Sequence, residues 1–511
     1  MSIIFLSKSV MSATYLHNEA DLKDPLGQKL LIRKRIGQVL LSLCCVVPIL
    51  LRNGETSGTY MRLIFVWAAP VLLMLWSFAY QLLICLPKTH TILPIAVPTI
   101  YLWIVDTLAL HRGTWSIALG TKLGIHLWPF LEIEEAVFFL ITNTLVVWGA
   151  TAYDNAVAVL DAFPEHFPYV PGTPSPPLLL RGLFLSTSKY DTERLEGLKK
   201  ALSVLARKSR SFYLASGVFA GRLRIDLILL YGFCRVADDL IDNVTSEKEA
   251  EAWVKHFTEF LTVMYSSKAD GSKIKEALKP FPSEVQPVLV QLPVDKLPSE
   301  PLYMLLDGFR MDQKFLNKDD NSSPPIQTFA DLQQYATCVA ATIGELCLHL
   351  VFHHDPDRNT DATTKQKCLE SGAGMGRALQ YVNIVRDVPT DAEDGRCYIP
   401  AEWLTSWESP EEEKVGRERE IAQLRKKILD IAFTQYAENR DAIENLPSYA
   451  RAGIRVAVES YMEIGRIMRD RLVANQPLNF AGGGKVGRAS VPKRRRLMVG
   501  WQTMRGWRGA L

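Results

Sequence analysis

The stretch YGFCRVADDLID, residues 231–242, decides the fold of this chain. It mixes apolar residues at helical spacing with carboxylates, and two of these, Asp238 and Asp242, are four residues apart. On an α-helix, side chains with that spacing lie one turn apart on the same face. The stretch therefore predicts a helix with one acidic face in apolar surroundings, where an unpaired carboxylate is costly.

A second acidic stretch, NIVRDVPTD (383–391), repeats the pattern with Asp387 and Asp391. One such pair arises easily by chance on a surface helix, but two pairs inside apolar segments favour a metal site. Magnesium prefers carboxylate oxygen and bridges a few carboxylates to substrate phosphates. Two acidic helices that face each other would hold magnesium between them, and the metal would neutralise a bound diphosphate.

These two stretches resemble the phytoene and squalene synthases. The likeness runs from about residue 190 to residue 475 and includes five blocks in the family's order. The blocks are ARKSRSFYLAS (206–216), YGFCRVADDLID (231–242), LLDGFRMD (305–312), LQQYATCVAATIGE (332–345) and GRALQYVNIVRDVPTDAEDGRCYIP (376–400). The resemblance implies an isoprenoid-synthase-type helical bundle.

The resemblance also implies roles for residues inside the blocks. The implied ligands of magnesium, or of manganese in its place, are Asp238, Asp242, Asn383, Asp387 and Asp391. The four aspartates and Tyr231 are the expected catalytic residues. The expected substrate-binding residues are Ser209, Phe212, Arg235, Tyr335, Gln380, Asn383, Arg386, Arg396 and Tyr398. Guanidinium groups suit diphosphate oxygens, and aromatic faces stabilise a carbocation. For each aromatic residue, ordinary core packing is an equally good explanation.

The implied reaction joins two geranylgeranyl diphosphates head to head. A cyclopropylcarbinyl diphosphate forms first, then ionises again and rearranges to phytoene with loss of a proton. A squalene-type synthase, which ends the second step with hydride from NADPH, is one alternative. A non-catalytic membrane assembly protein is another, although the two intact acidic pairs speak against it.

The first third of the chain contains four apolar runs, at residues 36–51, 63–86, 92–110 and 136–151. A spanning helix needs about 20 mostly apolar residues, so the two middle runs are expected to cross a membrane and the outer two are marginal. A buried helical core is the alternative. Basic residues before the first run favour a cytosolic N-terminus. Four crossings would also make the synthase region cytosolic, whereas three would not.

The block HLWPFLEIEEAVFFLITN (126–143), which leads into the last run, resembles the membrane carotenoid cyclases that are fused to phytoene synthase in fungi. Cyclising lycopene needs a proton donor, and carboxyl groups in an apolar setting are suited to that role. Glu134 and Glu135 are therefore expected catalytic residues of a cyclase. A charged cluster among lipid headgroups is the alternative. Such cyclases have two copies of this unit, and one is found here, which leaves the second activity open.

The remaining features set the organisation of the chain. The predicted fold class is all-α, with an N-terminal transmembrane helical domain before the isoprenoid-synthase-type bundle. The expected domains are 1–160 (partial cyclase), 161–185 (a Pro-rich linker that prevents regular helix), 186–475 (synthase) and 476–511 (a basic tail without fixed structure).

The composition limits the partners and the cellular setting. The net charge of +3 excludes nucleic acid as a main partner, and the eight scattered cysteines indicate reduced thiols. The expected partners are geranylgeranyl diphosphate, phytoene, lycopene and a lipid bilayer, with other carotenoid enzymes as further candidates. From Lys485 onward the tail has eight basic residues and no acidic ones, together with Trp501 and Trp507. It is expected either to touch a membrane surface or to be a solvated tail.

Overall fold

The structure of the chain is a computed structural model that divides into two compact units, Met1–Glu196 and Gly197–Leu511. It describes residues 11–21, 24–50, 57–118, 120–267, 270–316, 323–355, 359–405, 410–474 and 491–506. Within these ranges two short strands interrupt a chain of helices, so the predicted all-α fold class is confirmed. The division falls inside helix α7 (Thr192–Lys208).

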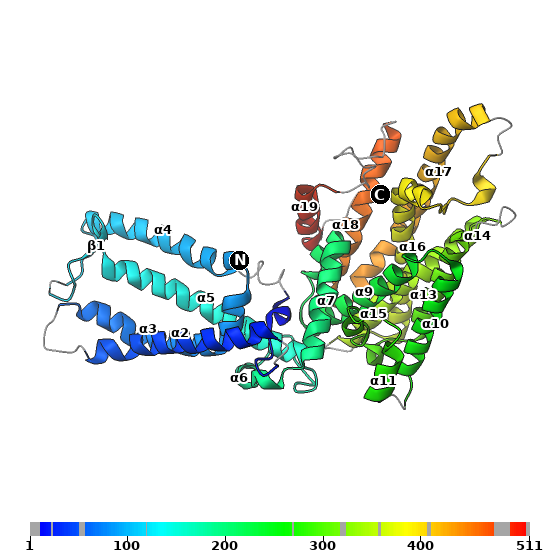
Figure 1. The fold of residues 1–511 in the computed structure, drawn as a ribbon. Helices are drawn as coiled ribbons and strands as arrows, with labels where there is room; N and C mark the ends of the chain where they lie inside the picture. Colours follow the sequence, from blue (N-terminus) through cyan, green and yellow to red (C-terminus); the bar gives the residue numbers. More distant parts are fainter. Residues whose placement is uncertain are drawn as a thin grey trace. The chain divides into compact units, whose positions relative to one another are not determined.

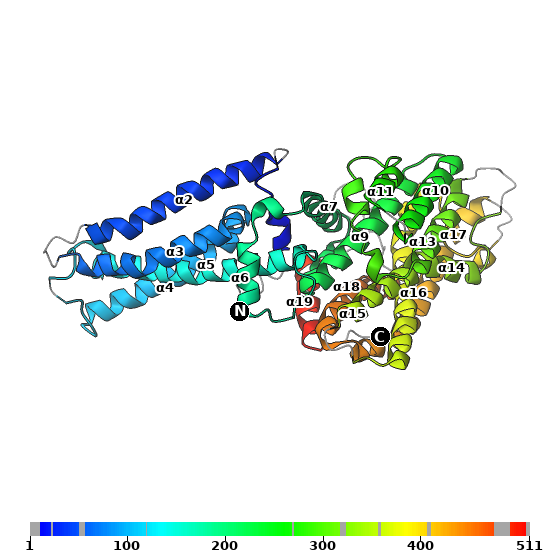
Figure 2. The same ribbon diagram turned by 90° about the horizontal axis from the view of Figure 1, so that it is seen from below.

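The first unit is built on four long helices, which Figures 1 and 2 show side by side. They are α2 (Pro25–Leu50), α3 (Thr59–Cys85), α4 (Ile92–His111) and α5 (Ile133–Ala162). The shorter elements are η1 (Ser12–Tyr15), η2 (Lys88–His90), β1 (His126–Trp128), β2 (Leu131–Glu132), α6 (Pro176–Phe184) and η3 (Thr187–Lys189). The strands pair antiparallel in a two-stranded hairpin directly before α5.

The long helices of the first unit turn many apolar side chains outward. Val97 and Tyr101 on α4 are about two-thirds exposed, and Val146 on α5 is similar. Polar groups instead bond between helices, as when Asn155 Nδ2 donates to the Phe78 carbonyl at 3.0 Å. An apolar exterior around internally satisfied polar groups is what a bilayer requires.

Three helical segments of this unit are long and apolar enough to cross a membrane, namely Thr59–Cys85, Lys88–His111 and Ile133–Ala162. The prediction for the middle two runs is thereby supported, and the marginal last run lies in a sufficiently long helix. Among the described residues α2 does not qualify, because its first half carries Lys29 and the cluster Arg33–Arg35.

The predicted Pro-rich linker begins as expected and then becomes helical. Residues 163–175 contain no helix, but α6 starts at Pro176. Proline is tolerated in the first turn of a helix, where its missing N–H would have no partner. The expectation that the prolines of residues 163–177 exclude regular helix is therefore wrong for the last two of them, Pro176 and Pro177, which begin α6.

The second unit contains the remaining helices. They are α8 (Arg210–Ser216), α9 (Gly221–Asp242), α10 (Glu247–Met264), α11 (Gly271–Leu278), α12 (Gln286–Leu289), α13 (Glu300–Gln313), α14 (Phe329–Ala336), α15 (Thr342–His353), α16 (Ala362–Glu393), α17 (Pro410–Asn439), α18 (Ser448–Val473) and α19 (Lys493–Met504). Short turns separate some of them: η4 (Val294–Lys296), η5 (Lys314–Leu316), η6 (Thr337–Ala341), η7 (Ala401–Trp403) and η8 (Arg440–Asn445). Side chains cap several of the helix starts, and at α14 Thr328 and Asp331 form a capping box.

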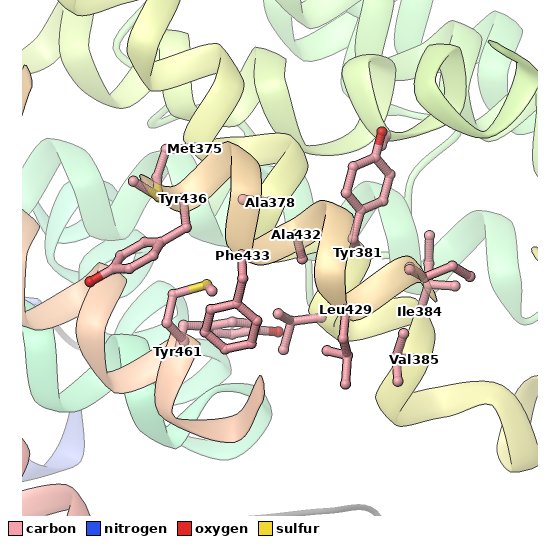
Figure 3. Close-up of a cluster of buried hydrophobic side chains, with 14 of the residues drawn as sticks. Met375, Ala378, Tyr381, Ile384, Val385, Leu429, Ala432, Phe433, Tyr436 and Tyr461 are labelled. Atoms are coloured by element: carbon pink, nitrogen blue, oxygen red, sulfur yellow. The ribbon is translucent and has the colours of Figure 1, made fainter. Parts of the chain in front are cut away.

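The core of the second unit lies where α16, α17 and α18 meet. Figure 3 shows side chains of this cluster from all three helices: Tyr381 from α16, which points away from the others, Phe433 and Tyr436 from α17, and Tyr461 from α18. Tyr381 and Tyr436 are fully buried. Fully burying a large apolar side chain contributes about 1.5–3 kcal/mol, so this cluster holds α16, α17 and α18 together.

One helix of the second unit is apolar enough to pass for a membrane span. Phe329–His353 meets the criteria of length and composition, yet more than half of its apolar window is buried inside the unit. A π-helical turn, η6, interrupts it between α14 and α15. The buried fraction identifies it as a core helix, in accord with its place in the synthase-like sequence.

The tail was predicted to lack fixed structure, and this is wrong for residues 493–504. They form α19, which packs on α18. Arg495 Nε bonds to Glu463 Oε1 at 2.5 Å, and Val499 and Thr503 are buried. The four consecutive basic residues suggested a solvated segment, but Val499, Gly500 and Thr503 give the helix an inner face. Residues 475–490 and Trp507 lie outside the described residues.

A buried ion cluster fastens three elements of the second unit. Asp226 on α9 is 2% exposed, and its Oδ2 lies 2.7 Å from Lys296 Nζ of η4 and 2.6 Å from His354 Nε2 after α15. Burial alone would raise the pKa of Asp226, but the hydrogen bond with His354 and the charge of Lys296 hold that pKa below its ordinary value.

We expect Asp226→Asn to lower the unfolding free energy by about 3–5 kcal/mol, since it leaves Lys296 buried without its anion. Because the pKa of Asp226 is lowered, this carboxylate adds to the unfolding free energy of the wild-type protein. The added stability is complete above about pH 4 and is lost as the pH falls through the folded-state pKa. Thermal unfolding is followed by near-UV circular dichroism, and the variant should not show this loss of stability in acid. Glu259→Gln, which removes an exposed pair with Lys255, is the control and should change stability by less than about 0.5 kcal/mol. Equal effects of the two variants would refute the buried-cluster account.

Candidate active site

Both predicted acidic pairs line one cavity of about 780 Å³ in the second unit. Asp238 and Asp242 enter it from α9, and Asp387 and Asp391 enter it from α16. Ligand pockets usually measure about 300–1,000 Å³, so this cavity is suited to a large ligand. The structure therefore brings together carboxylates that are about 150 residues apart in sequence.

Each acidic pair is held by an arginine in this structure. Arg235 NH1 lies 2.7 Å from Asp238 Oδ2, and Arg396 NH2 lies 3.1 Å from Asp242 Oδ1. Arg386 binds Asp387 through two nitrogens, at 2.9 and 2.6 Å. These guanidinium groups line the same cavity, so positive charge stands ready beside the carboxylates.

The electrostatic setting of the first pair is visible at Asp238. Burial raises the pKa of its carboxyl to about 6, and the nearby charge of Asp242 acts in the same direction. Arg235 opposes that rise. A carboxylate in this position gains from any further cation placed beside it.

The donor chemistry fits a divalent metal that also binds the ligand. In the part of the chain that the structure describes, no three His, Cys, Asp or Glu side chains lie close enough to hold a metal by themselves. Magnesium, however, is commonly bound by one or two carboxylates together with waters and phosphates. Asn383 fits less well, because its Oδ1 already accepts a hydrogen bond from Tyr461.

The predicted substrate-binding residues all reach the same cavity. They are Ser209, Phe212, Arg235, Tyr335, Gln380, Asn383, Arg386, Arg396 and Tyr398. Tyr231, the fifth expected catalytic residue of the synthase, lines it too. Further basic side chains that the sequence did not single out also line it, namely Arg207, Lys208, Arg210 and Arg496.

Aromatic rings form one wall of the cavity. Phe212 stacks on Tyr461 with centroids 5.3 Å apart, and its edge meets Tyr231 at 6.3 Å. Burial raises the pKa of Tyr231 to about 12, so this hydroxyl stays neutral. Tyr461 was not predicted, although it lies on a strongly amphipathic helix and could have been found as an inward-facing aromatic.

Asp312 is a buried acid of the cavity that sequence reasoning missed. Tyr335 donates to its Oδ2 at 3.0 Å, and Tyr398 donates to its Oδ1 at 2.7 Å. Burial raises the pKa of Asp312 to about 7. A signal was present, because Asp312 continues the apolar face of α13 defined by Leu305 and Phe309.

Glycines let the helices behind the cavity approach closely. A Cβ at Gly344 would stand 2.6 Å from the Gly372 carbonyl oxygen, and one at Gly376 would stand 2.4 Å from that of Ala340. Backbone atoms cannot yield as a flexible side chain would. The three glycines thus fix the spacing of α15 and α16, and they also line the cavity.

The predicted cyclase carboxyls lie in the first unit, in the first turn of α5. Glu134 and Glu135 are almost fully buried. The Leu123 N–H donates to Glu134 Oε1 at 2.6 Å, and Tyr60 of α3 shares a hydrogen bond with Glu135. Asp106 of α4, which sequence reasoning missed, is also buried and lies near Glu135.

Each of these three carboxyls keeps one oxygen without a hydrogen-bond partner among the described residues: Glu134 Oε2, Glu135 Oε1 and Asp106 Oδ2. Glu132 Oε2 also has no hydrogen-bond partner among the described residues, but the charge of Glu132 is paired with Lys122 and lies 3.4 Å from His126. Two helices, α4 and α5, therefore bring acidic groups to one buried place, and α3 adds the hydroxyl of Tyr60.

Comparison with known proteins gives consistent results. A family model described as squalene/phytoene synthase matches residues 205–495. The bifunctional lycopene cyclase/phytoene synthase of Leptosphaeria maculans is 47% identical over 505 residues, covering 98% of this chain and 84% of that protein. Its counterpart in Pyrenophora tritici-repentis is 49% identical over 457 residues, covering 89% and 76%. A solved dehydrosqualene synthase complex is 20% identical, with a TM-score of 0.44, over 61% of this chain and 96% of that one.

Asp312→Asn should remove a pH dependence from the stability of the protein. The folded state keeps the Asp312 proton up to about pH 7, whereas the unfolded chain releases it near pH 3.9. Wild-type stability should therefore decline between about pH 4 and 7, by up to about 4 kcal/mol from this group. Thermal unfolding of the variant should lack that decline.

Asp307→Asn is the matched control for this measurement, because Asp307 is exposed on the same helix and paired with Arg310. It should leave the pH profile of wild type unchanged. A profile of Asp312→Asn that keeps the wild-type slope would rule out a protonated Asp312 in the fold.

Proposed function

The chain belongs to the squalene/phytoene synthase family and to the fungal bifunctional lycopene cyclases/phytoene synthases, and we propose that its second unit condenses two geranylgeranyl diphosphates to phytoene. The observation that carries the proposal is the single cavity lined by two acidic pairs, their arginines and an aromatic wall. A squalene-type reaction is not favoured, because relatives that are 47% and 49% identical over most of this chain are named lycopene cyclase/phytoene synthases.

The polar end of the cavity would hold the two diphosphates. Arg235, Arg386 and Arg396 would turn from the aspartates to the phosphate oxygens, for which the guanidinium fork is well shaped. The family uses a divalent metal for diphosphate binding. We assign magnesium as that metal here, with Asp238, Asp242, Asp387 and Asp391 as its protein ligands, and it would neutralise the departing diphosphate.

The apolar and aromatic end would take the prenyl chains and protect the reaction. Ionisation of the allylic C–O bond releases diphosphate and leaves a carbocation that water would trap. Phe212 and Tyr231 would stabilise that charge through their ring faces without reacting with it. Loss of a proton ends the second rearrangement, so no hydride donor is required.

The first unit is proposed to cyclise lycopene-type ends. Its relatives carry the name lycopene cyclase, and Glu134 and Glu135 lie beside Asp106 in a buried site. A carboxyl group there would donate the proton that starts ring closure. We also propose that the chain is a multi-pass membrane protein, since three apolar helical segments support membrane association. The cytosolic synthase unit that we propose requires α2 to cross as the fourth helix.

Asp238→Asn and Asp387→Asn should each lower phytoene formation by about 10²–10⁴-fold, since several kcal/mol of charge stabilisation is lost. The assay follows labelled geranylgeranyl diphosphate in the presence of magnesium, with the full chain in detergent. Asp239→Asn makes the same charge change one residue away and outside the cavity, so it should cost less than about tenfold. Near wild-type turnover of Asp238→Asn at saturating magnesium would refute the metal assignment.

Replacing Glu134 and Glu135 together by Gln should abolish conversion of lycopene to a cyclic product while leaving phytoene formation intact. Asp106→Asn should also reduce cyclisation, because it removes the nearest buried carboxyl of α4. Glu132→Gln is the control, since the charge of Glu132 is already paired with Lys122. Unchanged cyclisation by the double variant, measured by chromatography of the pigments, would eliminate these carboxyls as the acid.

A further inference from the structure

Helix α19 has two faces of opposite character. Its inner face contacts the second unit through Val499, Gly500 and Thr503, all buried. Arg455 NH1 bonds to the Thr503 carbonyl at 3.4 Å, and the Gly500 Cα side lies against Val456 and Leu214. This face therefore belongs to the fold of the second unit.

The outer face of α19 is apolar, exposed and bounded by charge. Leu497, Met498 and Trp501 are each about half exposed. With Arg494 and Arg505, which are also exposed, they follow the spacing i, i+3, i+4, i+7 and i+11. At 100° per residue this spacing forms a single stripe along a helix. The Arg505 guanidinium lies 4.0 Å from the ring centre of Trp501 at the end of the stripe.

The charge around this stripe has one sign. The described residues 491–506 include five Lys or Arg residues and no Asp or Glu. Isolated exposed apolar residues are ordinary, but an apolar stripe with a tryptophan between arginines is the composition of an interfacial helix. Basic residues near an anionic leaflet each contribute about 1 kcal/mol, and tryptophan prefers the headgroup layer.

We propose that the outer face of α19, formed by Arg494, Leu497, Met498, Trp501 and Arg505, docks on an anionic lipid surface. The same chain carries three segments able to cross a bilayer, so a lipid surface is always available to the second unit. Docking would be peripheral, because α19 has 12 residues and its inner face stays on the protein.

Docking would also bring the synthase cavity to the lipid. Arg496 has the helical spacing of the inner face, three, four and seven residues before Val499, Gly500 and Thr503, and it lines the cavity. This helix therefore forms part of the cavity wall, with the lipid-facing stripe on its opposite side. The product of the proposed reaction is an apolar hydrocarbon and would leave near the bilayer. The docking itself depends only on the surface of α19 and not on which prenyl diphosphate the cavity accepts.

Photo-crosslinking in nanodiscs tests the docking with the full chain. Met498→p-benzoylphenylalanine places the probe on the stripe, and mass spectrometry separates crosslinks to lipid from crosslinks to protein. In discs containing phosphatidylserine at low salt, we expect lipid crosslinks. They should fall at least about fivefold in phosphatidylcholine discs or at high salt, because surface charge is screened or absent.

Arg494→Gln with Arg505→Gln, added to the probe variant, should reduce the lipid crosslinks in anionic discs to the level of neutral discs. Neither arginine lines the cavity, so unchanged phytoene formation in detergent shows that the unit remains folded. Crosslinks to protein, from the first unit or a second copy, would overturn the proposal. The proposal would also be overturned if the yield of lipid crosslinks did not change with lipid charge, with salt or with replacement of both arginines.

Discussion

The second unit depends on keeping four aspartates together beside one cavity. Like charges at such a site repel each other, and carboxylates lose hydration there. The arginines at 235, 386 and 396 supply the opposite charge, and they come from the same two acidic segments or directly after one. The site is thus assembled in a neutralised form, and a diphosphate would exchange partners with groups already in place.

The acidic segments could be predicted because two side chains four residues apart lie on the same face of a helix. Every residue expected to bind the substrate lines the cavity. This follows because each motif contains a helical segment together with the residues on its inward face. Asp312 could not be singled out in the same way. It has no acidic partner four residues away, and its only signal is that it continues the apolar face of α13, whereas Asp307 on the same helix is exposed.

In the tail and in the first unit, tertiary packing overrides what the local sequence pattern indicates. Four consecutive basic residues read as a solvated segment, but three small or apolar side chains after them were enough to seat α19 on α18. In the first unit the glutamates of α5 were visible as charges beside an apolar run. Their neighbour Asp106 was hidden, because its partner helices are distant in sequence and helix pairing in a membrane leaves little periodic signal.

The helix Phe329–His353, as apolar as a membrane span but seated in the core, bears on how prenyl chains partition. Its residues Val339, Ala340 and Ile343 line the cavity, so the interior offers a solvent much like the acyl region of a bilayer. A chain that moves from the lipid phase into this cavity exchanges one hydrocarbon environment for another. The transfer gains little hydrophobic free energy, since no apolar surface leaves water. Retention of a membrane-dissolved substrate must then come from its headgroup, and a product that lacks a headgroup has nothing to hold it.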